Sequence, residues 1–291
     1  MVQAPEEEVL RAARAAEAAA ARAHVRVEEV HGLPGEAAVS ELFDLVWGTD
    51  GVPVMPANLL HALSHAGNYL AAAYDGERMV GAAFGFMGER HGEVFLHSHM
   101  TGVDPELQRR GVGFALKLHQ RTWALSRNLP RIEWTFDPLV RHNSYFNLVK
   151  LGAEIIDYYE NFYGEMPDGI NAGDESDRVV VSWDLTSPRV AAACERGLPE
   201  PDLDRLRAEG AQIALDYDDE MRPVPSGGAG GPLLLCHIPK DVVSLRQTDP
   251  DAALTWRRAL RDSLGTALQN GHRAVAITRS GWYVLEQRAA A

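Results

Sequence analysis

The chain has 291 residues, of which 46% are hydrophobic and 24% are charged, and its 41 acidic against 28 basic residues give a formal net charge of −13. These proportions are typical of a soluble globular protein with a well-buried core, built as one large domain or two ordinary ones. A surface this acidic repels the phosphate backbone, so the charge excludes a general nucleic-acid-binding protein and mildly favours a cationic or amine substrate. A local basic pocket remains compatible with it.

Cysteine usage and hydropathy bear on the cellular compartment. Cys194 and Cys236 lie far apart without CxxC spacing, which predicts two reduced, structural thiols. No apolar run reaches the length of a membrane span, and the N-terminal "EEEVLRAARAAEAAAARAH" lacks the layout of a signal peptide. We therefore expect a cytoplasmic protein that does not bind membranes. Residues 1–23, rich in alanine, predict a helical extension that is either docked or a frayed lead-in.

Strands and helices alternate through the first two thirds of the chain. Asp75-Gly76 is a strong hairpin signal, and Gly152 stands where a short helix should end. The predicted strands are 24–30, two strands within 68–88, 93–103, 131–136, 153–164 and 178–185, and the predicted helices are 36–47, 57–66, 111–127 and 143–151. This order predicts an α/β fold (an α+β mixed sheet) with helices on the faces of the sheet.

Residues 186–291 predict a second, smaller α+β unit. A Gly-rich loop at 222–232 is followed by a predicted strand at 233–238, a helix at 251–269 and a hairpin at 274–287. The arginines of the helix predict a solvated face; they are Arg257, Arg258 and Arg261. This unit has no Gly-x-Gly turn, so we do not interpret it as a second catalytic copy. Covering a sheet edge and forming a homodimer contact are the two roles open to it.

The segment "VDPELQRRGVG" places arginines and glycines at the start of a predicted helix. A helix beginning at Gly111 presents backbone N–H groups and the positive end of its dipole, and Gly111 and Gly113 let an anion approach the backbone. The arrangement suits a phosphate or pyrophosphate, although an ordinary turn with surface arginines is the alternative. The dinucleotide fingerprint fails because Leu116 stands at its third glycine, and no P-loop fits.

The same segment resembles motif A of the GNAT N-acetyltransferases, Gln/Arg-x-x-Gly-x-Gly/Ala, which also follows a strand and opens an amphipathic helix. The element order up to Leu185 is similar to that fold, and so is "NSYFNLVKLGAE". The resemblance covers roughly residues 24–185. It implies an N-terminal helical extension (1–23), a GNAT-like acyl-CoA transferase domain (24–185) and a C-terminal α+β region (186–291).

The resemblance implies acetyl-CoA, or another acyl-CoA, as co-substrate. Its pyrophosphate would lie on the amides of residues 108–113, and the backbone of residues 100–103 would pair with the pantetheine like an added strand. The residues expected to hold it are Met100, Thr101, Val103, Gln108, Arg109, Arg110, Gly111, Val112, Gly113 and Asn143. We expect no metal, since a His-x-His pair without a nearby Cys or third ligand is a weak zinc signal.

Four residues are candidates for catalysis. The family's usual proton-donating Tyr position is occupied by Leu148; Tyr145, one turn earlier, is either a substitute or a core aromatic. His97 and His99 alternate to one face of their strand and suit a general base, with structural hydrogen bonding as the alternative. Glu133 is a second candidate base or else an exposed strand carboxylate.

These residues predict an acyltransferase that moves acetyl from acetyl-CoA to an amine by direct attack in a ternary complex. The loop "MPDGINAGDESDR" could offer Asp174, Glu175 or Asp177 to a cationic amine, although its composition is also that of any turn-rich loop. A non-catalytic acyl-CoA-binding or interaction module is the competing class. A hydrolase has no support, because no Gly-x-Ser-x-Gly elbow is present.

Overall fold

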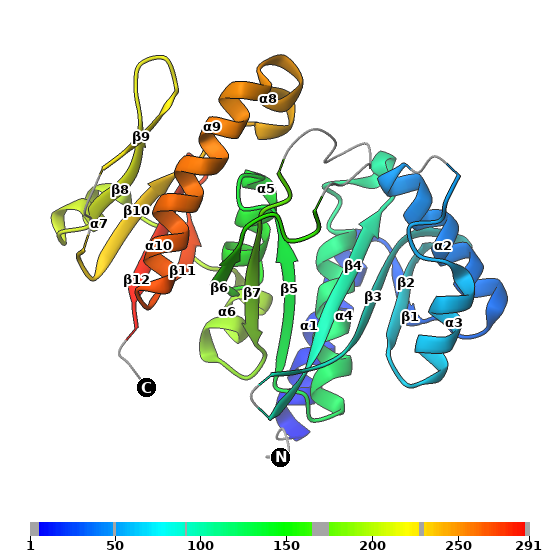
Figure 1. Cartoon of the computed structure of the whole chain (residues 1–291). Coiled ribbons are helices and arrows are strands. Elements are labelled where there is room, and N and C mark those ends of the chain that lie inside the picture. The colour runs from blue at the N-terminus through cyan, green and yellow to red at the C-terminus, as the bar shows by residue number, and fades with distance from the viewer. Residues whose placement is uncertain (1–5, 49–50, 91, 165–174, 227–229, 289–291) are drawn as a thin grey trace. The chain divides into compact units, whose positions relative to one another are not determined.

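The computed structural model describes residues 6–48, 51–90, 92–164, 175–226 and 230–288. The chain forms two compact units of nearly equal length (Figure 1). The first comprises Met1–Trp134 and Asp184–Glu195, and the second comprises Thr135–Trp183 and Arg196–Ala291. The boundaries of these units do not coincide with those of the expected domains, 24–185 and 186–291. That domain division remains a prediction.

The sheet of the first unit has the order β1-β2-β3-β4-β5. Its strands are β1 (Arg26–Glu29), β2 (Tyr69–Asp75), β3 (Arg78–Arg90), β4 (Glu93–Val103) and β5 (Arg131–Phe136), the last running across the limit of the unit. Strands β1 to β4 are antiparallel neighbours, and β4 pairs with β5 in parallel. The β2–β3 turn places Gly76 at φ +59°, the left-handed backbone that the Asp-Gly signal predicts.

Helices cover both faces of this sheet (Figure 1). Helices α2 (Leu33–Trp47) and α3 (Ala57–His65) lie on one face, and α4 (Val112–Ser126) lies on the other, beneath α1 (Glu6–Ala23). A side chain added at Gly81 would meet Val112 and Leu116 of α4, whereas one added at Gly102 would meet Trp47 of α2. The core between the sheet and α2 and α3 consists of Val30, Val39, Leu42, Phe43, Met55, Leu60, Leu70, Ala72, Ala82, Phe84 and Met100.

The N-terminal helix is docked, not frayed. Its alanines at positions 12, 15, 16, 19 and 23 are buried, and α1 packs along α4. The fully buried Arg121 of α4 donates one hydrogen bond to Glu8 (2.6 Å) and another to the carbonyl of Leu185 (2.7 Å). One guanidinium thereby joins α1, α4 and the segment that returns to this unit as α6 (Pro188–Arg196).

The sheet of the second unit has the order β7-β6-β11-β12-β10-β8-β9. Its strands are β6 (Glu154–Tyr159), β7 (Arg178–Asp184), β8 (Gln212–Tyr217), β9 (Pro223–Pro225), β10 (Leu233–His237), β11 (His272–Ile277) and β12 (Trp282–Gln287). Its α-helices are α5 (Arg141–Tyr145), α7 (Leu203–Ala208), α8 (Val242–Thr248), α9 (Pro250–Leu260) and α10 (Thr266–Gln269). Residues 146–150 and 261–265 are π-helical turns that continue α5 and α9. The fold is therefore the expected mixed α/β class.

The predicted solvated face of the helix at 251–269 is wrong for two of its three arginines, Arg257 of α9 and Arg261 of the π-helical turn. Arg257 is fully buried and donates to Asp137 (2.9 Å), and Arg261 donates to Asp177 (2.9 and 2.8 Å). Arg258 alone is mostly exposed. Helical spacing in the sequence cannot distinguish arginines that face water from arginines that face buried carboxylates of distant segments. No helix in the described part of the chain could cross a membrane.

Candidate functional site

The centre of the candidate site is a bulge in β4. Phe84 is the partner of Met100 and Gly85 is the partner of Ser98, so the intervening His99 is an extra residue in β4. In the described strands the register joins β4 to β5 at only two positions, at Leu96 and His97. The following residues of β4, which include Met100, Thr101 and Val103, are paired with β3 along one edge. Their other edge is suited to accepting an added extended segment.

The loop after β4 leads into the start of α4. Arg109 has φ +69° and Gly111 has φ +91°, so both residues are in the left-handed region that Gly accepts at little cost. Helix α4 begins with the hydrogen bond from the Ala115 amide to the Gly111 carbonyl (3.0 Å). Gln108, Arg109, Arg110 and Gly111 are exposed, Gly113 is half-buried and Val112 is buried. The loop therefore presents basic side chains beside the positive end of a fifteen-residue helix.

His97 and His99 share one face of β4, as the sequence predicted, but as part of an aromatic cluster. The ring of Phe86 lies 5.0 Å from that of His97 and 5.6 Å from that of His99, and the two imidazoles are 5.9 Å apart. Burial, together with the positive charges of His99, Lys117 and Arg90, lowers the pKa of His97 to about 4. Burial also lowers the pKa of His99. The lowered pKa values favour the neutral form of both imidazoles.

Glu133 is not the exposed carboxylate that was the alternative to a base. It is 1% exposed, is the register partner of His97, and lies within 3.3 Å of Arg90 and 3.2 Å of Arg131. Burial raises the pKa of Glu133, and the two arginines offset part of that increase. Because register partners point to the same face, Glu133 and His97 lie on one face of the sheet.

Sequence reasoning missed Lys117, which lies on the opposite side of β4. Its ammonium is buried and donates to Ser98 Oγ (3.0 Å) and Gln120 Oε1 (2.9 Å), and it lies 3.8 Å from the centroid of the Trp134 ring. Burial lowers the pKa of Lys117 to about 7. The missed signal was positional, because Lys117 stands between Leu116 and Leu118 on the buried side of α4.

Asn143 and Tyr145 belong to α5 in the second unit. Tyr145 is half-buried, and its hydroxyl accepts a hydrogen bond from Arg279 (3.4 Å), so it is not an enclosed core aromatic. Leu148, at the family's tyrosine position, is fully buried within the π-helical turn after α5. Gly152 ends this segment with φ +72°, as expected.

The loop acids are engaged within the second unit. Asp177 is fully buried and accepts hydrogen bonds from Tyr158 (2.6 Å) and Arg261. Glu175 accepts from Arg258 (3.2 Å) and Arg261. Asp174 lies outside the described residues. The arginines of α9 and its π-helical extension, not an acceptor amine, are the cationic partners of these two acids.

Comparison with solved structures finds several acetyltransferases. Among them are a GNAT-family acetyltransferase from Streptococcus pneumoniae (13% identity over 54% of this chain and 98% of that chain, TM-score 0.45), one from Elizabethkingia anophelis with acetyl-CoA bound (14%, 55% and 98%, 0.43) and the IAA acetyltransferase from Bacillus cereus (15%, 55% and 99%, 0.41). No curated protein shows significant similarity.

The family model described as "Acetyltransferase (GNAT) family" matches residues 37–146. The matched segment begins in α2, includes the bulged β4 and the loop of Arg109, Arg110 and Gly111, and ends just after α5. The chain therefore contains a GNAT-family segment at residues 37–146. Acyl transfer is accordingly its general class of activity.

Proposed function

We propose that the protein transfers an acetyl group from acetyl-CoA to an amine within a ternary complex. The amine nitrogen attacks the thioester carbonyl carbon, a C–N bond forms, the C–S bond breaks, and the CoA thiolate leaves. The proton lost by the amine is taken up by a base. The observation that carries this proposal is the bulged β4 followed directly by the Arg-Gly loop and α4.

The backbone conformation and packing at position 113 do not require a glycine. A glycine there is therefore consistent with close approach of a CoA pyrophosphate. The φ of Gly113 is not positive, and a Cβ added there would meet only Val103 Cγ2 at 3.7 Å, an ordinary contact. Gly111 differs, because its φ of +91° requires glycine. A glycine at 113 leaves the backbone of the first helical turn accessible to a large anion. The residues that would hold the pyrophosphate are those of the loop, from Gln108 to Gly113.

We infer that the base belongs to the group formed by His97, His99 and Glu133, which lies on one face at the point where β4 leaves β5. The neutral imidazoles can accept the proton that the acceptor ammonium loses to become the attacking amine, directly or through water. Tyr145 remains the candidate proton donor. Transfer does not depend on that donor, because a CoA thiolate is a tolerable leaving group.

Calorimetry and a thiol-release assay together test this proposal. The full chain is titrated with acetyl-CoA, and release of free CoA thiol is then followed with a panel of diamines, amino acids and N-terminal peptides. Binding together with amine-dependent thiol release is the expected result. Binding without turnover across the panel favours the non-catalytic module, which Leu148 in place of the family's tyrosine keeps in consideration. Absence of binding rejects both functions.

A further inference from the structure

A cavity of about 320 Å³ lies beside the Arg-Gly loop, and its volume falls in the range of small-ligand pockets of roughly 300–1,000 Å³. The end of α1 and the start of α4 line part of it. Its charged or titratable lining residues are Arg22 of α1, His24 directly after α1, Arg110 of the loop and Asp75 of the β2–β3 turn. The cavity is thus lined by two permanent cations and a histidine against one carboxylate.

Packing fixes the end of α1 at this place. A Cβ at Gly111 would lie 3.8 Å from that of Ala23, so the last turn of α1 contacts the first residue of the loop-to-helix transition. Helix α1 stops there because His24 adopts φ +55° and its amide bonds back to the Ala21 carbonyl (3.2 Å). The position of Arg22 relative to Arg110 is therefore set by the buried α1–α4 contact.

CoA carries more charge than its pyrophosphate. A phosphate on the 3′ position of its ribose adds a charge of roughly −1.5 to −2 at neutral pH, close to the pyrophosphate. Guanidinium groups bind phosphate oxygens with paired, charge-assisted hydrogen bonds. The loop can hold the pyrophosphate through backbone amides, which leaves the side chains of Arg22 and Arg110 for a second phosphate.

We propose that Arg22, with Arg110, binds the 3′-phosphate of CoA, so that the N-terminal helix forms a nucleotide-recognition subsite from outside the segment that matches the family model. The proposal rests on acyl-CoA being the substrate. It gives α1 a role in discriminating CoA from related thiols and nucleotides that lack the 3′-phosphate.

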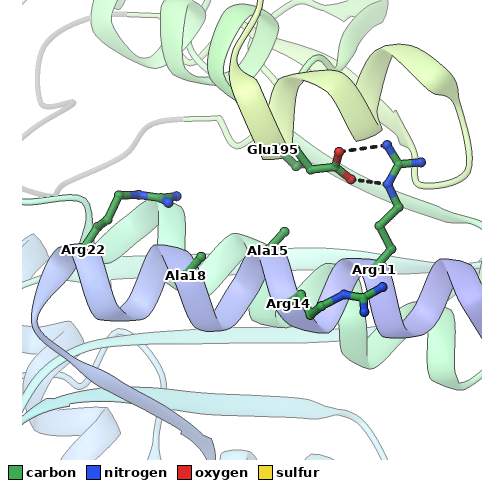
Figure 2. A pocket seen from close by; sticks show the side chains of 7 residues that line it. Arg11, Arg14, Ala15, Ala18, Arg22 and Glu195 are labelled. Carbon is green, nitrogen blue, oxygen red and sulfur yellow. Dashed lines mark hydrogen bonds and ion pairs between the residues drawn. The ribbon is translucent and has the colours of Figure 1, made fainter.

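The same helix provides a matched control. A neighbouring cavity of about 340 Å³ is lined by Arg11, Arg14 and Arg22 of α1 and by Cys194 and Glu195 of α6. Figure 2 shows Arg11 paired to Glu195, and Arg14 and Arg22 along the same helix. Arg14 is an exposed arginine two helical turns before Arg22, about 12 Å away along the axis, and does not line the cavity beside the loop.

Calorimetric titration of the full chain with acetyl-CoA and with 3′-dephospho-acetyl-CoA, at one ionic strength, tests the subsite. We expect the unmodified protein to bind acetyl-CoA about tenfold more tightly than the dephospho compound, as suits one charge-assisted contact. Arg22→Ala should reduce this preference by weakening acetyl-CoA binding only, because Arg110 remains. Arg14→Ala should keep it. Circular dichroism checks that both variants retain α1.

Four results overturn the proposal. Equal binding of the two compounds by the unmodified protein removes the subsite while leaving the acyl-CoA function intact. A preference that is undiminished in Arg22→Ala, or an equal weakening of both compounds, shows that Arg22 does not contact the 3′-phosphate. A protein that binds neither compound refutes the proposed function together with the subsite.

Discussion

Glycine occupies positions 111 and 113, at the start of α4, for two different physical reasons. Gly111 needs its left-handed backbone, whereas Gly113 is in the first turn of the helix with an ordinary φ and room for a methyl group. Gly113→Ala should raise the free energy of unfolding by up to about 1 kcal/mol, through helix propensity, and weaken acetyl-CoA binding. Gly111→Ala should lower stability by roughly 1 kcal/mol or more. Thermal unfolding and calorimetry measure the two effects.

A rise in stability without loss of affinity in Gly113→Ala would show that no ligand approaches this backbone. Loss of both stability and affinity would contradict the prediction, which expects stability to rise while affinity for acetyl-CoA falls. In that case the weaker binding could result from damage to the fold. The sequence motif predicted both glycines correctly, but only the dihedral angles separate the one required by the fold from the one available to a ligand.

A second prediction at the residue scale concerns His97 as the base. Since its pKa is lowered to about 4, it becomes protonated only below the usual histidine range. If His97 is the base, kcat/KM should stay level as pH falls through 6.5 and should decline near pH 4. His97→Ala should lower kcat by about 100-fold, with little change in the affinity for acetyl-CoA.

The pH–rate profile of the unmodified protein and the kinetics of His97→Ala and His99→Ala provide the check. His31→Ala, an exposed histidine outside the site, is the control. Unchanged kinetics in both site variants would remove the imidazoles from the mechanism and leave Glu133 as the candidate base. A decline centred near 6.5 would indicate a different titrating group.

Lys117 makes stability depend on pH. Its pKa is about 7 when folded against an ordinary value of 10.5, so the unfolded chain binds more protons between these pH values. Stability should therefore rise with pH across this window, by at most roughly 1.4 kcal/mol per unit. Below pH 7 the full cost of burying the ammonium is present, and above 10.5 it disappears.

Lys117→Met should accordingly be more stable than the unmodified chain below pH 7, and it should lose most of this slope. Urea unfolding at a series of pH values between 6 and 10 gives both quantities. Lys150→Met, at an exposed position, is the matched control and should leave the slope unchanged. Parallel slopes in the unmodified chain and Lys117→Met would contradict the buried-ammonium account.

At the scale of elements, the strands and helices up to residue 185 follow the sequence pattern closely, and β4 occupies the predicted 93–103. The pattern could not show the bulge at His99, because an extra residue in one strand depends on what the neighbouring strand pairs with. It also missed α6, α7, β8, β9 and α8, and it merged α9, the π-helical turn and α10 into one helix. Apolar periodicity does not register a single-turn change of helix type.

Helix α9 is held to the segment after β5 by charge. Asp137 is buried and accepts hydrogen bonds from Arg257 (2.9 Å) and Arg246. Burial alone would raise the pKa of Asp137, but the two arginines outweigh it and hold the pKa below its usual value. Removing the carboxylate leaves two arginines that it had neutralised, so Asp137→Asn should cost about 3–5 kcal/mol of unfolding free energy.

Chemical denaturation at neutral pH measures this cost. The contribution of Asp137 should be fully present above the unfolded pKa of 3.8 and lost as pH falls through its lower folded value. Glu209→Gln, which breaks the exposed Arg205–Glu209 pair, should change stability by less than about 1 kcal/mol. Comparable losses in the two variants would show that burial adds nothing to the Asp137 contacts.

At the scale of the whole molecule, the C-terminal region is part of the second unit and not a separate addition to it. Strand β6 pairs with β11 at Ile155 and Ala274, and the π-helical Gly265 lies against Tyr158, its added Cβ falling 3.6 Å from that ring. The resemblance ended at residue 185 because it was based on the motifs and element order typical of the family. Apolar periodicity does not predict which strand of the C-terminal region pairs with which strand of the family segment, because that pairing depends on tertiary structure.

This organisation predicts an uneven response to truncation. A chain ending at residue 195 retains every residue of the first unit but loses the pairing of β6 with β11 and the arginines that bind Asp137 and Asp177. Hydrogen exchange should then show α1 and α4 still protected while residues 135–164 exchange freely, because β6 lacks its β11 partner and Asp137 and Asp177 lack their arginines. The full-length chain is the reference for both segments. Protection of residues 135–164 in the truncated chain would contradict this prediction. It would mean that these residues fold without the C-terminal region, so that the region is not needed to complete the second unit.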